Sequence, residues 1–269
     1  MTSRHALAAL ILVLAPAVSP RSAVAQVTPP IVLSAADAEA LGGLLPDIID
    51  EIPKHLGVQN QQQRELLRFS TTHWNFGDGA LQVRGGGQEA PCVIEQIPTV
   101  CTFAMQEILD AQGQIVAVHP AGIALFHPEH NHWHQSDVAE FAVRATLDGD
   151  PVGGRQLKTT FCLIDLDYSD EIHPRKTKTY WDCDADLQGI SVGHGDPYHQ
   201  ALEGQSIDIT GLPAGDYYLT FDADPDQHWL ETDDTNNRSW AKFRLDRKGA
   251  NPSVTVLETF GYPGNTSNK

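Results

Sequence analysis

Histidines gather in one short segment of the chain, His127–His134. Four of the 12 histidines lie there, and three of them, His130, His132 and His134, stand at alternate positions. Alternate residues of a strand share one face, and such neighbours are about 6.5–7 Å apart along the backbone. Imidazoles tilted inward from these positions can bind one metal ion at about 2 Å. The spacing therefore predicts a metal site on a strand, in preference to a set of solvated or core histidines.

The kind of metal depends on which chemistry the rest of the chain supports. Three imidazoles with one open coordination position suit a zinc hydrolase that activates a bound water, or a redox-active copper centre. The zinc hydrolase motif H-E-x-x-H is absent from the sequence, which weakens the zinc hypothesis. Copper is favoured if residues suited to redox chemistry occur elsewhere in the chain.

The N-terminus has the features of a secretory signal. Residues 1–25 combine a basic start, an apolar stretch over Ala6–Val18 and the small-residue sequence Ala23-Val24-Ala25. We expect this segment to be cleaved, so that the protein is secreted to the periplasm or the extracellular space. The apolar stretch is broken by Pro16 and is too short to cross a bilayer comfortably. No membrane span is predicted.

The chain is strongly acidic. Its formal net charge is -17, from 35 acidic and 18 basic residues. A field of this sign repels nucleic acid and attracts cations, including amines and metal ions. We therefore expect no nucleic-acid partner, although acidity alone does not separate cation binding from simple solubility.

Four cysteines, at positions 92, 101, 162 and 183, form an even set in a chain that we expect to be exported. Disulfides are the default in that setting. Three pairings are possible, and we favour the local one, Cys92 with Cys101 and Cys162 with Cys183. None of the four has the short spacing of a zinc ribbon or a thioredoxin site.

Short apolar runs alternate with turn residues from Glu65 onward, which is typical of an all-β chain. Residues 206–217 alternate, turn at Pro213-Ala214-Gly215 and alternate again, as paired strands of a sandwich do. A helix is expected over Ala35–Leu44, and Gly85-Gly86-Gly87 is interpreted as a loop. We predict one all-β domain, residues 26–269, folded as an antiparallel β-sandwich with long loops and short helices. The clearest strands are expected at Glu65–Phe69, Ala80–Val83, Ile115–Ala117, Ala139–Ala145, Thr159–Ile164 and Tyr217–Phe221.

The histidine segment resembles the copper motif of the lysyl oxidase family, W-H-x-C-H-x-H-x-H. Phe126 replaces the Trp and Glu129 replaces the Cys, whereas all four histidines match. Further family blocks follow in the same order, so the similarity covers about residues 45–245 and suggests a secreted, bacterial-type member. These blocks are Leu66-Leu67-Arg68-Phe69, Lys158–Leu163, Gly189–Ser191 with its continuation to Thr210, Pro213–Tyr217 and Glu231–Asn237.

This resemblance implies a copper-dependent amine oxidase with a self-made cofactor, lysine tyrosylquinone. Lys158 falls on the family's crosslinking lysine and Tyr198 on its precursor tyrosine, while an earlier tyrosine of that block is Gly195 here. Copper(II) can draw an electron from a nearby phenolate, dioxygen oxidises the ring, and a deprotonated lysine amine adds to it. The cofactor would then oxidise primary amines, peptidyl lysine among them, to aldehyde, ammonia and hydrogen peroxide.

The base that removes the substrate's α-proton has no motif of its own. Asp196 lies two residues before Tyr198 and can project on the same side of a strand. A carboxylate beside copper would stay ionised, which suits a base. The competing interpretation is a turn-forming Asp before Pro197.

A second metal site is implied towards the end of the domain. Glu231, Asp233, Asn236 and Asn237 supply hard oxygen donors within seven residues, and calcium prefers such donors. In the family this segment binds calcium together with an Asp and a backbone carbonyl near the N-terminus. Pro46-Asp47-Ile48 matches that upstream sequence, so the resemblance adds the Asp47 carboxylate and the Ile48 carbonyl to the site. A solvated acidic turn is the alternative.

The sequence departs from the animal members of the family in two respects. Cys183 lacks its usual partner where Glu129 stands, so pairing with Cys162 would be a rearrangement. The collagen-directed and scavenger-receptor extensions are not found in these 269 residues, and we expect small diamines or lysine side chains of surface proteins as substrates rather than collagen or elastin. The rival to an oxidase is a non-catalytic secreted β-sandwich module that binds copper and calcium.

Overall fold

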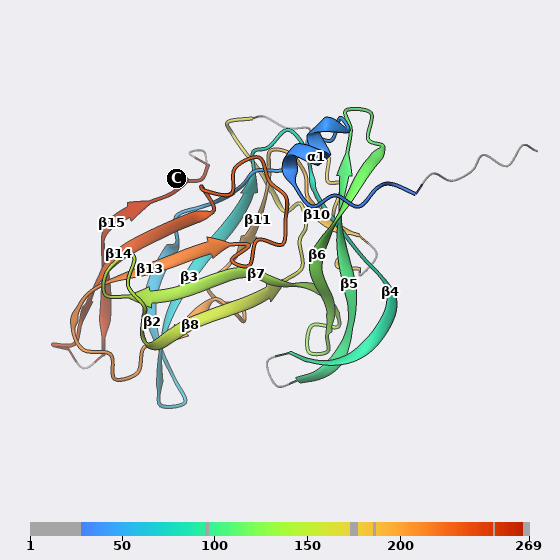
Figure 1. The fold of residues 1–269 in the computed structure, drawn as a ribbon. Coiled ribbons are helices and arrows are strands. Elements are labelled where there is room, and N and C mark those ends of the chain that lie inside the picture. Colours follow the sequence, from blue (N-terminus) through green and yellow to red (C-terminus); the bar gives the residue numbers. More distant parts are fainter. Residues whose placement is uncertain (1–27, 95–96, 173–176, 185–186, 250, 266–269) are drawn as a thin grey trace, which may run out of the picture.

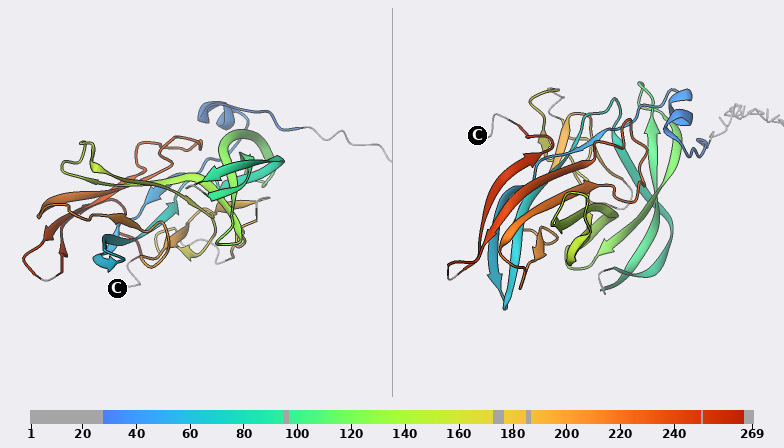
Figure 2. Two further views of the ribbon diagram at one scale, coloured as in Figure 1. Left: turned by 90° about the horizontal axis from the view of Figure 1, so that it is seen from below. Right: turned by 60° about the vertical axis from the view of Figure 1, so that its left-hand side comes forward.

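The computed structural model describes residues 28–265 apart from 95–96, 173–176, 185–186 and 250. Within them the chain forms strands β1–β15 and one helix, α1 (Ala35–Ala40). The strands make two antiparallel sheets that stack as layers, as the view from below in Figure 2 shows. The all-β sandwich prediction is confirmed. The predicted signal, residues 1–25, lies outside the described residues.

The smaller sheet is organised around one long strand, β3 (Arg64–Asn75). Its first half pairs with β2 and β12 and its second half with β1 and β11, while β9 adds to β11. This sheet therefore brings together segments that are far apart in the sequence. The other bounds are β1 (Ile48–Asp50), β2 (Lys54–Gln61), β9 (Asp167–Tyr168), β11 (His194–Tyr198) and β12 (Ser206–Asp208).

The larger sheet runs in the order β10-β4-β5-β6-β7-β13-β14-β15, with β8 also paired to β7. Figure 1 shows β4, β5 and β6 curving away from the rest at one end. The strand β7 (His132–Arg144) pairs with β6 through its first residues and with β13 through its last, so it links the two parts. The other bounds are β4 (Leu81–Ile94), β5 (Ile97–Leu109), β6 (Ile115–His127), β8 (Pro151–Phe161), β10 (Gln188–Ile190), β13 (Gly215–Ala223), β14 (Arg238–Asp246) and β15 (Ser253–Phe260).

The core fills the space between the two sheets. Strand β14 buries alternate residues, as expected for a strand with one face inward. Phe69 of β3, Phe141 of β7 and Phe221 of β13 are fully buried. The ring centroid of Phe141 lies 4.8 Å from that of Phe69 and 5.1 Å from that of Phe221. Aromatic contacts between the layers thus fix how β3 lies over β7 and β13.

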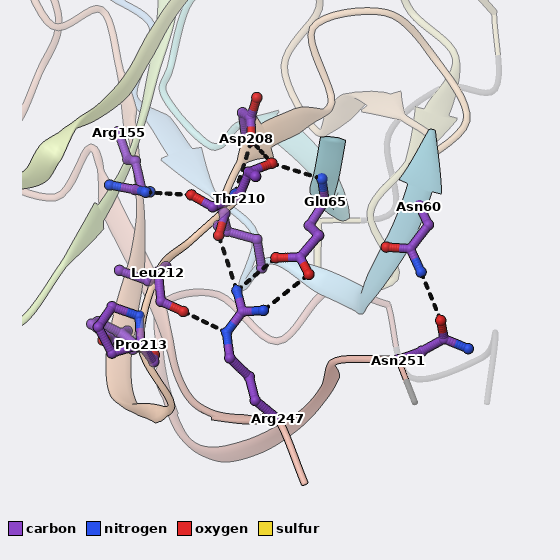
Figure 3. A network of polar contacts seen from close by, with 11 residues as sticks. Asn60, Glu65, Arg155, Asp208, Thr210, Leu212, Pro213, Arg247 and Asn251 are labelled. Carbon is purple, nitrogen blue, oxygen red and sulfur yellow. Dashed lines mark hydrogen bonds and ion pairs between the residues drawn. The ribbon is translucent and has the colours of Figure 1, made fainter. Parts of the chain in front are cut away.

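A polar network also fastens the sheets to each other (Figure 3). Arg247, which follows β14, makes a bidentate contact of 2.9 and 2.6 Å with Glu65 of β3. Its Nε donates to the Leu212 carbonyl, and the Glu65 N–H donates to Thr210 Oγ1 at 2.9 Å. Because guanidinium and carboxylate are geometrically matched, this corner joins strands of both sheets.

Both predicted disulfides are confirmed. Cys92 and Cys101 join β4 to β5 across their hairpin, and Cys162 bonds Cys183. The second bond connects the end of β8 to the segment before β10. This segment lies beside the histidines, because the N–H of Trp133, between His132 and His134, donates to the Cys183 carbonyl at 2.9 Å. The disulfide helps to hold it there.

Five local expectations are corrected. The two runs within residues 206–217 do not pair with each other, because β12 pairs with β3 in the smaller sheet and β13 pairs with β7 and β14 in the larger sheet. The helix ends at Ala40 rather than Leu44, where backbone bonds around Gly42 and Gly43 close its last turn. Gly85-Gly86-Gly87 lies inside β4 at a register shift and is not a loop, because glycine tolerates the strained backbone of a bulge. The strand expected over Thr159–Ile164 ends at Phe161. His130 is not on the strand with His132 and His134, as described below.

Candidate metal centre and its pocket

The three predicted metal-binding histidines come together where β6 turns into β7. His132 and His134 are the first and third residues of β7, whereas His130 lies in the turn before it. The turn closes because the Asn131 N–H donates to the His127 carbonyl at 2.8 Å, with Asn131 at a φ of 57°. Asparagine tolerates this left-handed conformation better than most residues. The turn, and not strand alternation, therefore places His130.

The ring nitrogens of the three histidines converge on one point. His134 Nε2 lies 2.9 Å from His132 Nε2 and 3.2 Å from His130 Nδ1. Two nitrogens that each bind one ion at about 2 Å are about 3 Å apart. Within the described chain these are the one group of three His, Cys, Asp or Glu side chains whose ligand atoms lie within 4.8 Å of one another. The donor set fits a metal ion that prefers imidazole.

Burial keeps the imidazoles of His132 and His134 in the neutral form that binds metals. The pKa of His134 is lowered to about 3, chiefly by burial and further by the neighbouring histidines. Burial also lowers the pKa of His132. Near neutral pH both rings therefore offer a lone pair without first losing a proton.

Residues that the sequence analysis did not propose as metal ligands support the histidines. Thr160 Oγ1 contacts His134 Nδ1 at 3.0 Å, which leaves Nε2 of that ring facing the other histidines. His127 stacks on His130 with centroids 4.0 Å apart, and Glu203 reaches within 3.4 Å of His130 Nε2. Thr160 lies in the family block Lys158–Leu163, and this was the sequence signal that could have pointed to it. No sequence signal pointed to Glu203.

The histidines line one side of a pocket of about 400 Å³. Tyr198 and Asp196 of β11 line the same pocket. Its other walls are largely apolar and come from the end of β8 and from the segments after β8 and β11, with Phe161, Ile164, Leu166 and Leu202 among them. A metal ion and the phenol of Tyr198 would thus share one cavity.

The phenol of Tyr198 is held by two short contacts. Its oxygen lies 2.6 Å from Asp196 Oδ2 and 2.5 Å from the Cys162 carbonyl, and its ring stacks on Phe161 at 3.8 Å. A phenol has one hydrogen to donate, so it can donate to both acceptors only in turn. Burial raises the pKa of Asp196 well above its usual value, and a protonated Asp196 can donate to the phenol while the phenol donates to Cys162.

Lys158 is placed differently from Tyr198. It lies on β8 opposite Glu140, and its Nζ is 2.6 and 2.7 Å from the two carboxylate oxygens of Asp226. The hydrogen bond to Asp226 is the main cause of a raised pKa. Lys158 is not among the residues that line the pocket, although the next two residues, Thr159 and Thr160, are. The structure therefore brings Tyr198 and Asp196 to the histidines and leaves Lys158 beside them in an ion pair.

Comparison with known proteins decides the family. Residues 106–253, more than half of the chain, match the family model described as lysyl oxidase. The chain belongs to the lysyl oxidase family. It is 34% identical over 155 residues to lysyl oxidase homolog 3A of Danio rerio, covering 54% of this chain and 20% of that protein. It is 33% identical over 122 residues to lysyl oxidase homolog 2 of Xenopus laevis, covering 45% of this chain and 15% of that protein. The match thus spans a fifth or less of these curated relatives.

The second predicted metal site of this lysyl oxidase family member joins the segment Pro46–Ile48 to the loop Glu231–Asn237. Glu231 Oε2 accepts the Ile48 N–H at 2.5 Å, and the Thr232 N–H donates to the Pro46 carbonyl at 2.9 Å. Asn236 Nδ2 donates to Asp47 Oδ1 at 2.9 Å. The predicted neighbours are therefore in contact, although they are more than 180 residues apart in the sequence.

Unsatisfied oxygens remain in this acidic site. Asn236 Oδ1 and Asn237 Oδ1 are buried without a hydrogen-bond partner, and burial raises the pKa of Glu231 well above its usual value. Both features fit a cation with oxygen ligands. Asp233 is exposed and accepts hydrogen bonds from its own neighbour Thr235, so its carboxylate is turned to its own loop.

No helix among the described residues is long and apolar enough to cross a membrane.

Proposed function

We propose that this protein is a copper-dependent amine oxidase that converts primary amines, dioxygen and water to aldehydes, ammonia and hydrogen peroxide. One observation carries the proposal: the phenol of Tyr198 lines the same pocket as His130, His132 and His134. Membership of the lysyl oxidase family supports the same reaction. Peptidyl lysine and small diamines are the substrate classes that we favour.

His130, His132 and His134 would hold copper through nitrogens that already lie at ligand spacing. Thr160 would fix the ring of His134 through Nδ1. Copper ions bind imidazole well, and copper would supply the one-electron chemistry with dioxygen that oxidises a nearby phenol. Zinc binding by the same nitrogens would not supply that chemistry, which is why we prefer copper.

Tyr198 and Lys158 would form the lysine tyrosylquinone, a carbonyl cofactor that accepts the electrons of the amine. Forming it requires dioxygen as the oxidant and a neutral amine on Lys158 as the nucleophile. Lys158 must therefore leave Asp226 and give up a proton, because the ion pair both holds Nζ and raises its pKa. Thr160, two residues along β8, already lines the pocket, so a local movement of β8 and its neighbours is required.

Asp196 is the base that we propose for removing the substrate's α-proton. Its Oδ2 contacts the oxygen of Tyr198, and its side chain lies in the pocket. Because burial favours the protonated carboxyl group, a positive charge in the pocket is needed to ionise it. A bound copper ion or a protonated amine would provide that charge.

The apolar wall of the pocket suits the methylene chain of a lysine or a diamine. Glu203 is 60% exposed beside His130 and gives the amine an acidic approach. We further propose that residues 1–25 direct the protein to secretion, because two disulfides need an oxidising compartment to persist. These features fit a substrate met outside the cytoplasm.

Calcium at the acidic site is the third part of the proposal. Asp47, the Ile48 carbonyl, Glu231, Asn236 and Asn237 would bind it, and Asp233 would need to turn from Thr235 to join them. The unpartnered oxygens of Asn236 and Asn237 support the site. Calcium there would tie the segment before β1 to the loop between β13 and β14.

A non-catalytic copper- and calcium-binding module is the second candidate function. The ion pair of Lys158 with Asp226 favours it, because a lysine that never reaches Tyr198 would leave the cofactor unformed. Such a protein would bind both metals and release no peroxide.

Loading the purified protein with copper in air separates the two functions. An oxidase yields a quinone colour, a Lys158–Tyr198 crosslinked peptide on mass mapping, and peroxide release from a diamine that a hydrazine blocks. Tyr198→Phe should keep copper and lose all three, whereas Tyr218→Phe, outside the pocket, should keep all three. Wild-type protein with bound copper but neither colour nor crosslink would establish the binding module.

A further inference from the structure

A row of three ionisable side chains crosses the smaller sheet behind Tyr198. Asp50 of β1 lies directly opposite His73 of β3, and His73 lies directly opposite Asp196 of β11. Directly opposed residues of antiparallel strands have Cβ atoms about 4.5–5.5 Å apart on one face. All three are buried, with at most 1% of each exposed. The row ends on the phenol of Tyr198, which contacts Asp196 Oδ2.

Such a row is costly unless its polar atoms are paired, because burying an unpaired polar group is unfavourable. Asp50 Oδ1 lies 2.9 Å from His73 Nδ1. Burial raises the pKa of Asp50 well above its usual value, so a protonated Asp50 donates to Nδ1 and the single ring hydrogen lies on Nε2. His73 Nε2 and Asp196 Oδ1 are both buried without a partner. The two unpartnered atoms therefore belong to side chains that leave the same face from opposed positions.

Asp196 needs a donor at Oδ1 whichever form it takes. Its Oδ2 accepts the Ile164 N–H and faces the phenol of Tyr198. In the acid form a proton on Oδ2 can be donated to the phenol oxygen, because the phenol donates its own hydrogen to the Cys162 carbonyl. Oδ1 is then an acceptor both in the acid and in the carboxylate. Burial lowers the pKa of His73 to about 3, so its ring is neutral and has one N–H to donate.

We propose that His73 Nε2–H donates to Asp196 Oδ1, and that His73, oriented by Asp50, is the positioning residue that holds Asp196 against Tyr198 and favours its ionised form. The role of Asp196 as a base rests on the proposed function, but the hydrogen bond does not. His73 acts through Asp196 and touches neither substrate nor metal. A donor to a carboxylate stabilises the anion and so lowers its proton affinity.

The unpartnered imidazole on β11, the strand of Asp196, must be distinguished from His73. His194 lies two residues before Asp196 on β11, and its Nε2 is also buried without a partner. Its Nδ1 lies 3.3 Å from the Val192 carbonyl, which draws the ring away from Asp196 along the strand. Asp165, in the segment after β8, faces Asp196 as a further charge and raises its pKa. A test must therefore separate His73 from both.

The deciding measurement follows the carboxyl carbon of Asp196 by NMR in metal-free protein labelled with ¹³C-aspartate, assigned with Asp196→Asn. His73→Leu should raise the titration midpoint of Asp196 by about one pH unit or more, a tenfold gain in proton affinity. His73→Gln, which keeps an N–H donor, and His194→Leu should leave it near the wild-type value. A ¹⁵N-histidine spectrum of the wild type should place the His73 hydrogen on Nε2.

An unchanged or lowered midpoint in His73→Leu overturns the proposal, as does a His73 hydrogen on Nδ1 or a shift produced by His194→Leu instead. If His73→Leu does not fold, the wild-type ¹⁵N spectrum decides alone. These readouts need neither copper nor the cofactor, so their failure differs from failure of the oxidase proposal. In an active oxidase, His73→Leu should also move the acidic limb of the kcat/KM profile to higher pH, and His73→Gln should restore it.

Discussion

The histidine pocket and the acidic site between Asp47 and Asn237 differ in how their proposed ligands are arranged. The pocket's three ligand nitrogens come from one turn and one strand and face one another. The acidic site's ligands come from opposite ends of the domain, and several already bond one another, as Asn236 does with Asp47 and Asn237 with Glu231.

From this difference we infer different roles for a metal ion: a chemical role in the histidine pocket and a stabilising role at the acidic site. The converging imidazoles can share hydrogen bonds at 2.9 and 3.2 Å, but a neutral ring also has a lone pair to offer a cation. In the acidic site amide hydrogens partly take the place of a cation. We therefore expect copper to decide chemistry in the pocket and calcium to decide stability at the acidic site.

The largest expected effect is at the pocket. His132→Ala should weaken copper binding by more than about 100-fold, because outer partners of a metal ligand alone are worth about 10–100-fold. Metal analysis after dialysis against a copper buffer measures it. His119→Ala, which removes a histidine that contacts the Val32 carbonyl, should bind copper normally. Full copper occupancy in His132→Ala would show that the three histidines do not act together as the copper site.

Removing calcium should lower the melting temperature without changing copper content. A ligand at 100 times its dissociation constant contributes about 2.7 kcal/mol to stability, and a chain of this size shifts by about 2–4 °C per kcal/mol. We expect a loss of about 5–10 °C on chelation, measured by calorimetry. Glu231→Gln should lose most of this response and Asp233→Ala less, since Asp233 is exposed. Identical wild-type curves with and without calcium would argue against the site.

Thr160→Val sharpens the account of the pocket. Valine keeps the shape of threonine but cannot bond His134 Nδ1, so the ring loses the contact that directs Nε2 inward. Copper affinity should fall by about tenfold, as measured by competition with a chelator. Thr159→Val, one residue earlier, should change affinity less. Equal affinities for wild type and Thr160→Val would show that the turn alone positions His134.

The smallest effect concerns Lys158. Its pKa is raised, mainly by the hydrogen bond to Asp226, so fewer molecules carry the neutral amine that crosslinking needs at a given pH. Crosslinking should speed up as pH rises, and Asp226→Asn should shift that profile to lower pH. Since exposed ion pairs are worth about 0.2–1 kcal/mol, the gain should be at most about fivefold.

Asp216→Asn, which breaks the exposed pair with Arg244, is the matched control and should leave the rate of crosslinking unchanged. Quinone absorbance against time, with peptide mapping, measures the rate in both variants. A slower rate in Asp226→Asn would mean that Asp226 delivers Lys158 to the pocket rather than restraining it.

Local spacing allowed much of this protein to be predicted from sequence. Alternating apolar residues and turn signals indicated the all-β fold, and cysteines nine and 21 residues apart paired locally. The three histidines lie within five residues, so the chain itself keeps them close. Their motif also indicated the family. These features depend on backbone geometry over short stretches of chain, so they can be predicted from residue types and spacing alone.

Strand pairing decided what the sequence could not. The layers bring Asp226 to Lys158, and β1, β3 and β11 set Asp50, His73 and Asp196 in one row. A shift of one residue in the register of any of these strands would turn its side chain to the opposite face. Contacts across such distances in sequence depend on register and layer packing, so only the tertiary structure could reveal the ion pair of Lys158 and the row behind Tyr198.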